Sequence, residues 1–186
     1  MTDEEKNIRA YETALTTRNF EISLFWQRSL FFLGFIGAAF VGHAALRDAD
    51  SSLSLILACF GLVCSVAWSL VNRGSKYWQE AWEHKVDSSE DTVTGALFKL
   101  EVPAQGKGWW LSARRYSVSK LTIALSDYSA LVWIALLGWE ALRLLLPAHA
   151  TGDARLVGAA CWVVFTGVYC IALLWFGRSS PRAAAK

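Results

Sequence analysis

Residue types that bind metals or exchange protons gather in one short stretch of the sequence. His84 lies four residues after Glu80 and three before Asp87, and Glu83 directly precedes it. Residues at this spacing share a helix face, so the imidazole and carboxylates could bind a metal ion or act as acid and base on a lipid. No second segment offers further ligands. We therefore interpret the cluster as a solvated helix face, and we predict no metal, no cofactor and no catalytic residue.

The remaining sequence offers no other reactive motif. It lacks a Gly-rich phosphate loop, Gly-x-Ser-x-Gly and His-Glu-x-x-His. Four cysteines fall inside apolar stretches without a Cys-x-x-Cys pair, which favours buried reduced thiols: Cys59, Cys64, Cys161 and Cys170. The net charge of +2 is too small to indicate nucleic acid. We predict that the protein is not an enzyme and does not bind nucleic acid.

Polar side chains inside one apolar run carry more information, because such groups are costly in lipid. Near one end of residues 121–146, hydroxyl groups at spacings of three and four accompany a carboxylate, and this polar face comprises Ser119, Thr122, Ser126, Asp127 and Ser129. Near the other end, Glu140 and Arg143 are close enough to pair across a helical turn. The polar face would either line a hydrated passage or hydrogen-bond to a neighbouring helix.

The elements that position these residues are four long apolar runs, at 29–46, 53–71, 121–146 and 156–176. Each approaches or exceeds the roughly 18 to 20 residues that a helix needs to cross a bilayer, where backbone groups must bond internally. Hydrophobic residues make up 54% of the chain and charged residues 18%, below the ~25% typical of soluble domains. We predict an all-α integral membrane protein with four transmembrane helices, an N-terminal helical arm and a small cytoplasmic helical layer.

Basic residues give the orientation. Of 18 Lys and Arg, all but Arg47, Arg143 and Arg155 fall before the first run, between the second and third runs, or after the fourth. By the positive-inside rule these parts, including both termini, are cytoplasmic. The predicted parts are a cytoplasmic helix continuous with the first span (1–28), spans one and two (29–71), a cytoplasmic loop with helices (72–120), spans three and four (121–176) and a cytoplasmic tail (177–186).

The cytoplasmic parts carry their own helical signals. Thr2 and Glu5 have capping-box spacing. An apolar stripe follows that we expect to pack on protein, comprising Ile8, Tyr11, Leu15, Ile22 and Phe25. Residues 75–86 predict a helix with Trp78, Trp82 and Val86 on one face, residues 87–91 predict a break, and a second helix is expected from near Ser112.

Small residues repeat on the first two spans. Gly34, Ala38 and Gly42 recur every four residues on the first, and the second has a similar face at Ala58, Gly61, Ser65 and Ser69. Such faces let helix backbones approach closely. They predict tight packing, within one chain or between chains.

Three segments flanking the predicted spans together resemble the RipA family of octameric bacterial membrane proteins: 18–29 (RNFEISLFWQRS), 72–83 (NRGSKYWQEAWE) and 116–120 (YSVSK). The resemblance implies a homo-octamer in the bacterial inner membrane without an established enzymatic activity.

The charged and aromatic residues of the first two segments are the expected assembly contacts, within or between subunits: Arg18, Glu21, Trp26, Gln27, Arg28, Arg73, Lys76, Trp78, Glu80 and Trp82. We therefore expect a structural or scaffolding protein whose partners are its own copies and membrane lipids. The alternatives are an oligomeric channel, with Asp127 near the passage, and a lipid-modifying enzyme using His84 and Glu80.

Overall fold

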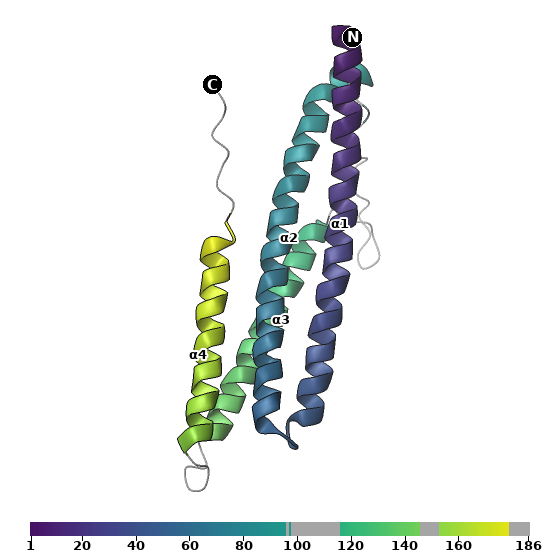
Figure 1. Cartoon of the computed structure of the whole chain (residues 1–186). Helices are drawn as coiled ribbons and strands as arrows, with labels where there is room; N and C mark the ends of the chain where they lie inside the picture. The colour runs from purple at the N-terminus through teal and green to yellow at the C-terminus, as the bar shows by residue number, and fades with distance from the viewer. Residues whose placement is uncertain (96, 98–115, 146–152, 179–186) are drawn as a thin grey trace. The chain divides into compact units, whose positions relative to one another are not determined.

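The computed structural model of the chain describes residues 1–95, 97, 116–145 and 153–178, and all regular secondary structure in these ranges is helical (Figure 1). The helices are α1 (Asp3–Leu46), α2 (Ser51–Val93), α3 (Val118–Leu145) and α4 (Asp153–Phe176). Each is long and apolar enough to cross a membrane. The predicted all-α fold with four candidate spans is confirmed. The helix start predicted near Ser112 lies outside the described residues.

The chain divides into two compact units. Unit 1 comprises Met1–Arg28 and Asn72–Thr122, and unit 2 comprises Ser29–Val71 and Ile123–Lys186. Helices α1, α2 and α3 each contribute residues to both units, because each of them crosses a unit boundary.

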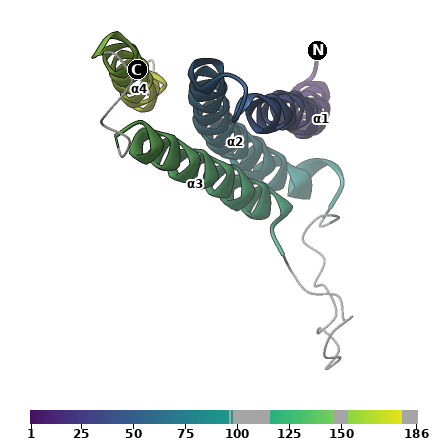
Figure 2. The ribbon, with the colours of Figure 1, turned by 90° about the horizontal axis from the view of Figure 1, so that it is seen from below.

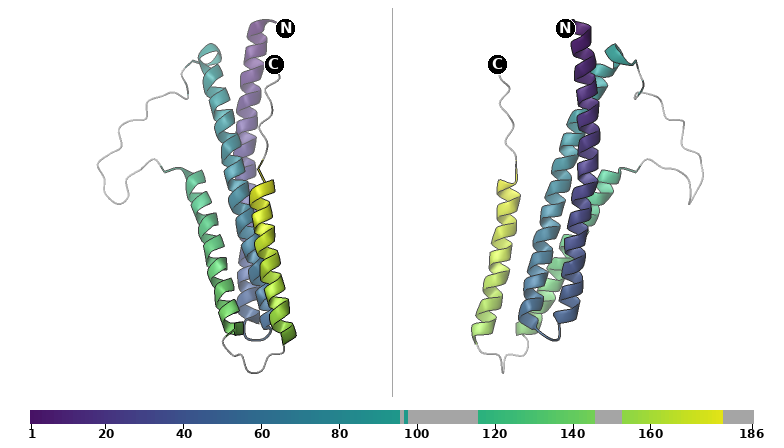
Figure 3. Two further views of the ribbon diagram at one scale, coloured as in Figure 1. Left: turned by 90° about the vertical axis from the view of Figure 1, so that its left-hand side faces the viewer. Right: turned by 45° about the vertical axis from the view of Figure 1, so that its right-hand side comes forward.

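Unit 1 is built on a pair of helical segments that run side by side, residues 3–28 of α1 and 72–93 of α2 (Figure 3). The predicted capping box starts α1: the Thr2 amide donates to Glu5 Oε2 at 2.9 Å, and the Glu5 amide donates to Thr2 Oγ1 at 3.2 Å. Tyr11, Ala14 and Val86 form a small buried core, with Leu15, Trp82 and Val93 packed against it. The predicted stripe of α1 therefore packs on protein around Tyr11 and Leu15.

The predicted break at residues 87–91 is wrong, because α2 continues as a helix to Val93. Val86 and Val93 face the unit 1 core, and Glu90 is fully buried, so this stretch packs against α1. The two serines fit into the helix because their hydroxyls bond to the carbonyl of an earlier turn. Ser88 Oγ and Ser89 Oγ both donate to the Lys85 carbonyl, at 2.9 and 3.1 Å. The helix ends where Gly95 adopts a φ of 72° and its amide bonds to the Glu90 carbonyl.

Unit 2 is packed around α2. This helix lies between α1 and α4, and α3 runs along a third side of it (Figure 2). In the most apolar stretch of each helix, half of the residues of α2 are buried, whereas only 11% of those of α4 are buried. The core contains residues from all four helices: Ala39, Leu55, Ala58, Cys59, Leu62, Trp133, Leu137 and Cys170. The other three helices expose most of their apolar side chains, as expected of surfaces that lipid or another subunit covers.

In unit 2, α2 packs closely against α3 at a glycine. A Cβ added to Gly61 would lie 2.2 Å from the Trp133 ring, so α2 and α3 can approach this closely only without a side chain at position 61. Gly61 belongs to the small-residue face predicted for the second span, and Ala58, Ser65 and Ser69 on that face are buried as well. The corresponding face of α1 differs along its length: Gly34 has no neighbour within 4 Å of an added Cβ, whereas a Cβ on Gly42 would lie 2.9 Å from Leu57 Cδ1 of α2.

Candidate functional site

Several of the predicted assembly residues make contacts within unit 1 of a single chain. Arg28 Nη1 donates to Ser75 Oγ at 3.1 Å, joining α1 to α2, and lies 3.9 Å from Glu21 Oε2. Arg18 Nε lies 3.8 Å from Glu83 Oε1 across the same helix pair. Trp82 packs against the buried core. The two segments therefore meet within one subunit at these residues.

Other members of the set contact their own helix or face outward. Lys76 Nζ pairs with Glu80 Oε1 at 3.1 Å, and Gln27 Nε2 donates to Ser23 Oγ at 3.4 Å, each within one helix. Trp26, Trp78 and Arg73 are exposed. These exposed side chains leave part of the predicted contact surface on the outside of unit 1.

The histidine cluster lies at a shallow hollow of unit 1. Arg18, Glu83, His84, Val86 and Asp87 line a space of about 320 Å³, and Glu80 does not contribute to it. Among the described residues, no three His, Cys, Asp or Glu side chains lie close enough together to hold a metal ion.

The predicted polar face of the third span is divided between the two units. In unit 2, Ser69 Oγ of α2 donates to Asp127 Oδ1 at 2.5 Å, and Ser65 Oγ and Ser129 Oγ lie 2.8 Å apart. Ser126 bonds to the Ile123 carbonyl of its own helix. In unit 1, Thr122 bonds to the Val118 carbonyl, and Ser119 Oγ donates to Gln79 Oε1 at 3.5 Å. Asp127 and Ser129 thus bond to the small-residue face of α2.

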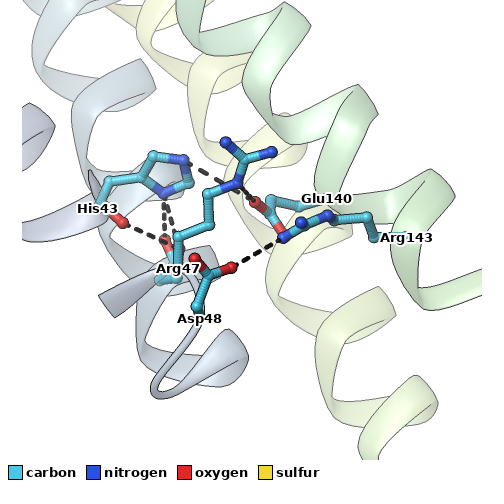
Figure 4. A network of polar contacts seen from close by, with 6 residues as sticks. His43, Arg47, Asp48, Glu140 and Arg143 are labelled. Carbon is cyan, nitrogen blue, oxygen red and sulfur yellow. Dashed lines mark hydrogen bonds and ion pairs between the residues drawn. The ribbon is translucent and has the colours of Figure 1, made fainter. Parts of the chain in front are cut away.

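A buried polar network in unit 2 was not predicted from the sequence (Figure 4). His43 of α1 is 5% exposed, Ser54 of α2 is 0% exposed and Glu140 of α3 is 3% exposed. His43 Nδ1 lies 2.9 Å from Ser54 Oγ and 3.1 Å from the Ser54 carbonyl oxygen. Its other ring nitrogen, Nε2, lies 3.9 Å from Glu140 Oε1. The network joins three helices.

Two arginines extend this network. Arg47 Nε lies 3.8 Å from Glu140 Oε1, and Arg143 Nη1 lies 3.8 Å from Asp48 Oδ1 in the turn after α1. Glu140 and Arg143, whose spacing would allow them to pair within one helix, thus lie next to partners outside α3. The two side chains diverge because α1 and its following turn offer each a partner of opposite charge.

Serine, histidine and glutamate are also the residues of a hydrolytic triad, but this geometry does not suit nucleophilic attack. In a triad the serine bonds to one ring nitrogen and the carboxylate orients the ring from the other, with the serine open to substrate. Here Ser54 is completely buried, and the His43–Glu140 distance exceeds that of a hydrogen bond. The arrangement is suited to holding three helices together.

The sequence did contain a partial signal for this network. His43 and Arg47 lie four residues apart at the end of the first apolar run, and Glu140 is a lone carboxylate near the end of the third. Each is costly in lipid unless it has a partner. The pairing itself could not be derived, because it depends on the packing of α3 against the turn between α1 and α2.

Comparison with known proteins gives one family match. Residues 8–142 match the octameric membrane protein family (8xMP), a stretch that includes nearly all of α1, α2 and α3. No curated protein and no solved structure matches the chain significantly.

Proposed function

Because this chain belongs to the octameric membrane protein family, we propose that it is a structural component of the bacterial inner membrane that assembles from eight copies and catalyses no reaction. The family description supports self-association of a membrane protein, and the four apolar helices support a multi-pass topology. The more specific resemblance to RipA proteins supports the same assembly and location.

The observation that carries this proposal is the outer surface of unit 1. On the α1–α2 pair of unit 1, residues 3–28 and 72–93, four large aromatic side chains remain substantially exposed: Phe20 at 59%, Trp26 at 46%, Tyr77 at 64% and Trp78 at 50%. Exposed charged side chains lie beside them along the same helices, and unit 1 packs through a small core of its own. Exposed aromatic groups of this kind are enriched in protein interfaces. In a family of octamers, a second copy is the partner that we assign to them.

Substituting these aromatic residues tests the proposal. We expect the double variant Trp26→Ser/Trp78→Ser to lose octamer in favour of smaller species, measured by native mass spectrometry from detergent. The matched control is Trp175→Ser on α4, which is 76% exposed but lies on an apolar surface suited to lipid. A Trp26→Ser/Trp78→Ser protein that remains as octameric as the wild type would contradict the assignment of this surface.

The orientation that we propose places both termini in the cytoplasm, on the strength of the basic residues flanking the spans. A green fluorescent protein fused after Lys186 should then fluoresce, and alkaline phosphatase fused there should be inactive. An active phosphatase would place the C-terminus outside the cytoplasm and contradict the proposed orientation.

A channel is the second candidate, favoured by the carboxylate of Asp127 within the third span. The bonds from Ser69 to Asp127 and between Ser65 and Ser129 argue for a packing role instead, because they engage these groups between two helices of one chain. Ion flux into liposomes distinguishes the two. Flux through the wild type that is lost in Asp127→Ala would support the channel.

A further inference from the structure

The hydrogen bonds around His43 indicate which ring nitrogen carries a proton. Nδ1 lies 3.1 Å from the backbone carbonyl oxygen of Ser54, which can only accept a hydrogen bond. A proton on Nδ1 satisfies this contact. The Ser54 hydroxyl, 2.9 Å from the same nitrogen, can then accept from it and donate its own proton to the His43 carbonyl at 3.5 Å. Nδ1 is therefore the donor, and in a neutral ring Nε2 is an acceptor.

This assignment leaves three polar atoms facing one another without a direct hydrogen bond. Nε2 of His43 and Oε1 of Glu140 are both acceptors, 3.9 Å apart. Arg47 Nε, a donor, lies 3.8 Å from the same Oε1. Neither Arg47 Nε nor Glu140 Oε1 makes a hydrogen bond with any described residue, although both atoms are buried. Buried polar atoms of this kind are rarely left unbonded.

An extra proton between Nε2 and Oε1 would resolve the conflict but would unbalance the charge. Arg47 and Glu140 already neutralise each other, whereas the other charges nearby, those of Arg143, Asp48 and Asp50, lie on exposed residues where solvent screens them. An added proton would leave a net positive charge beside His43 and Glu140, both more than nine-tenths buried. Burial of an uncompensated charge is strongly unfavourable.

We propose that His43, Glu140 and Arg47 bind one water molecule inside unit 2. A water molecule can bond to all three atoms. It donates one hydrogen bond to His43 Nε2 and one to Glu140 Oε1, and its oxygen accepts a hydrogen bond from Arg47 Nε. Atoms 3.8 to 3.9 Å apart are too distant for a direct hydrogen bond, whereas a water bonded to each at about 2.8 Å spans that separation. The bound water links the end of α1 to α3 without adding charge.

Solid-state NMR of ¹⁵N-histidine-labelled protein in lipid bilayers tests the proposal. The chain has three histidines, and loss of one signal set in His43→Gln identifies those of His43. At neutral pH we expect a neutral His43 ring with its proton on Nδ1, and magnetisation transfer from water to that ring. A doubly protonated ring, a proton on Nε2 alone, or no transfer from water would each overturn the proposal.

Variants then identify the atoms that hold the water. In Glu140→Gln the side-chain amide is a donor rather than an acceptor, so a rotation of this side chain can bring it within hydrogen-bond distance of Nε2 and displace the water. The transfer from water should then be lost while the Nδ1 proton remains. The matched control is Glu83→Gln in unit 1, which should keep the wild-type transfer. Persistence of the full transfer in a folded Glu140→Gln protein would contradict the site. The wild-type spectrum decides the proposal even where this variant does not fold.

Discussion

At the scale of single residues, two of the contacts between α2 and α3 in unit 2 differ in kind. Gly61 lies against the Trp133 ring, and Ser69 bonds to Asp127. One contact depends on shape and the other on polarity, so substitutions can separate them. Both involve residues of the small-residue face that the sequence predicted for the second span, although the sequence did not identify their partners.

Gly61→Ala tests the shape requirement. The new methyl group would collide with the Trp133 ring, so we expect a loss of about 1–3 kcal/mol in the free energy of unfolding. Thermal unfolding in detergent, followed by circular dichroism, measures it. Gly138→Ala on α3 is the control, since an added Cβ there has no neighbour within 4 Å. Equal stability of the two variants would contradict the close approach at position 61.

Ser69→Ala tests the polar contact. Loss of the hydroxyl removes a hydrogen bond to a carboxylate in an apolar setting, so we expect a cost of about 1–3 kcal/mol in the same unfolding measurement. Thr122→Ala is the matched control, because its hydroxyl bonds only to the Val118 carbonyl of its own helix and should cost less. A larger loss in the control than in Ser69→Ala would contradict this account.

At the scale of helices, periodicity and length predicted the four elements well, but not the end of α2. The sequence Asp87-Ser88-Ser89-Glu90-Asp91 has the composition of a turn, since its side chains often compete for backbone hydrogen bonds. Packing of Val86 and Val93 on α1 overrides that local preference. A local pattern could not reveal this, because the stabilising partner, Tyr11, lies far away in the sequence.

Ser89→Pro distinguishes a helix from a turn at this position. In a helix, proline removes the bond from the residue 89 amide and clashes with the preceding turn, at a cost of about 3 kcal/mol or more. We expect faster amide hydrogen exchange across residues 85–93 and around Tyr11. Ser51→Pro is the control, because it places proline at the first position of the same helix, where it is tolerated. Unchanged exchange in Ser89→Pro would favour a turn.

The His43 network shows a different limit of sequence reasoning at this scale. Glu140 and Arg143 satisfy the spacing rule for an intrahelical pair, but the structure gives each a partner in α1 or the turn after it. The spacing rule applies to isolated helices in water. Inside an apolar bundle, a buried carboxylate bonds wherever compensating groups are closest, and those groups come from other helices.

At the scale of the whole molecule, one chain leaves much apolar surface open, as membership in a family of octameric membrane proteins would lead one to expect. Only α2 is well buried in unit 2, and large aromatic groups remain exposed on unit 1. Lipid suits the apolar surfaces of α3 and α4, whereas the polar surroundings of Trp78 and Tyr77 suit contact with another copy. Assembly into eight copies is therefore the claim on which the proposed structural role depends.

The most direct test is the mass of the wild-type complex, measured by native mass spectrometry after extraction of the protein from the membrane in mild detergent. We predict a single dominant species that contains eight chains of 20.6 kDa each. A chain that remains a monomer or dimer under conditions that retain bound lipid would contradict the octameric assembly.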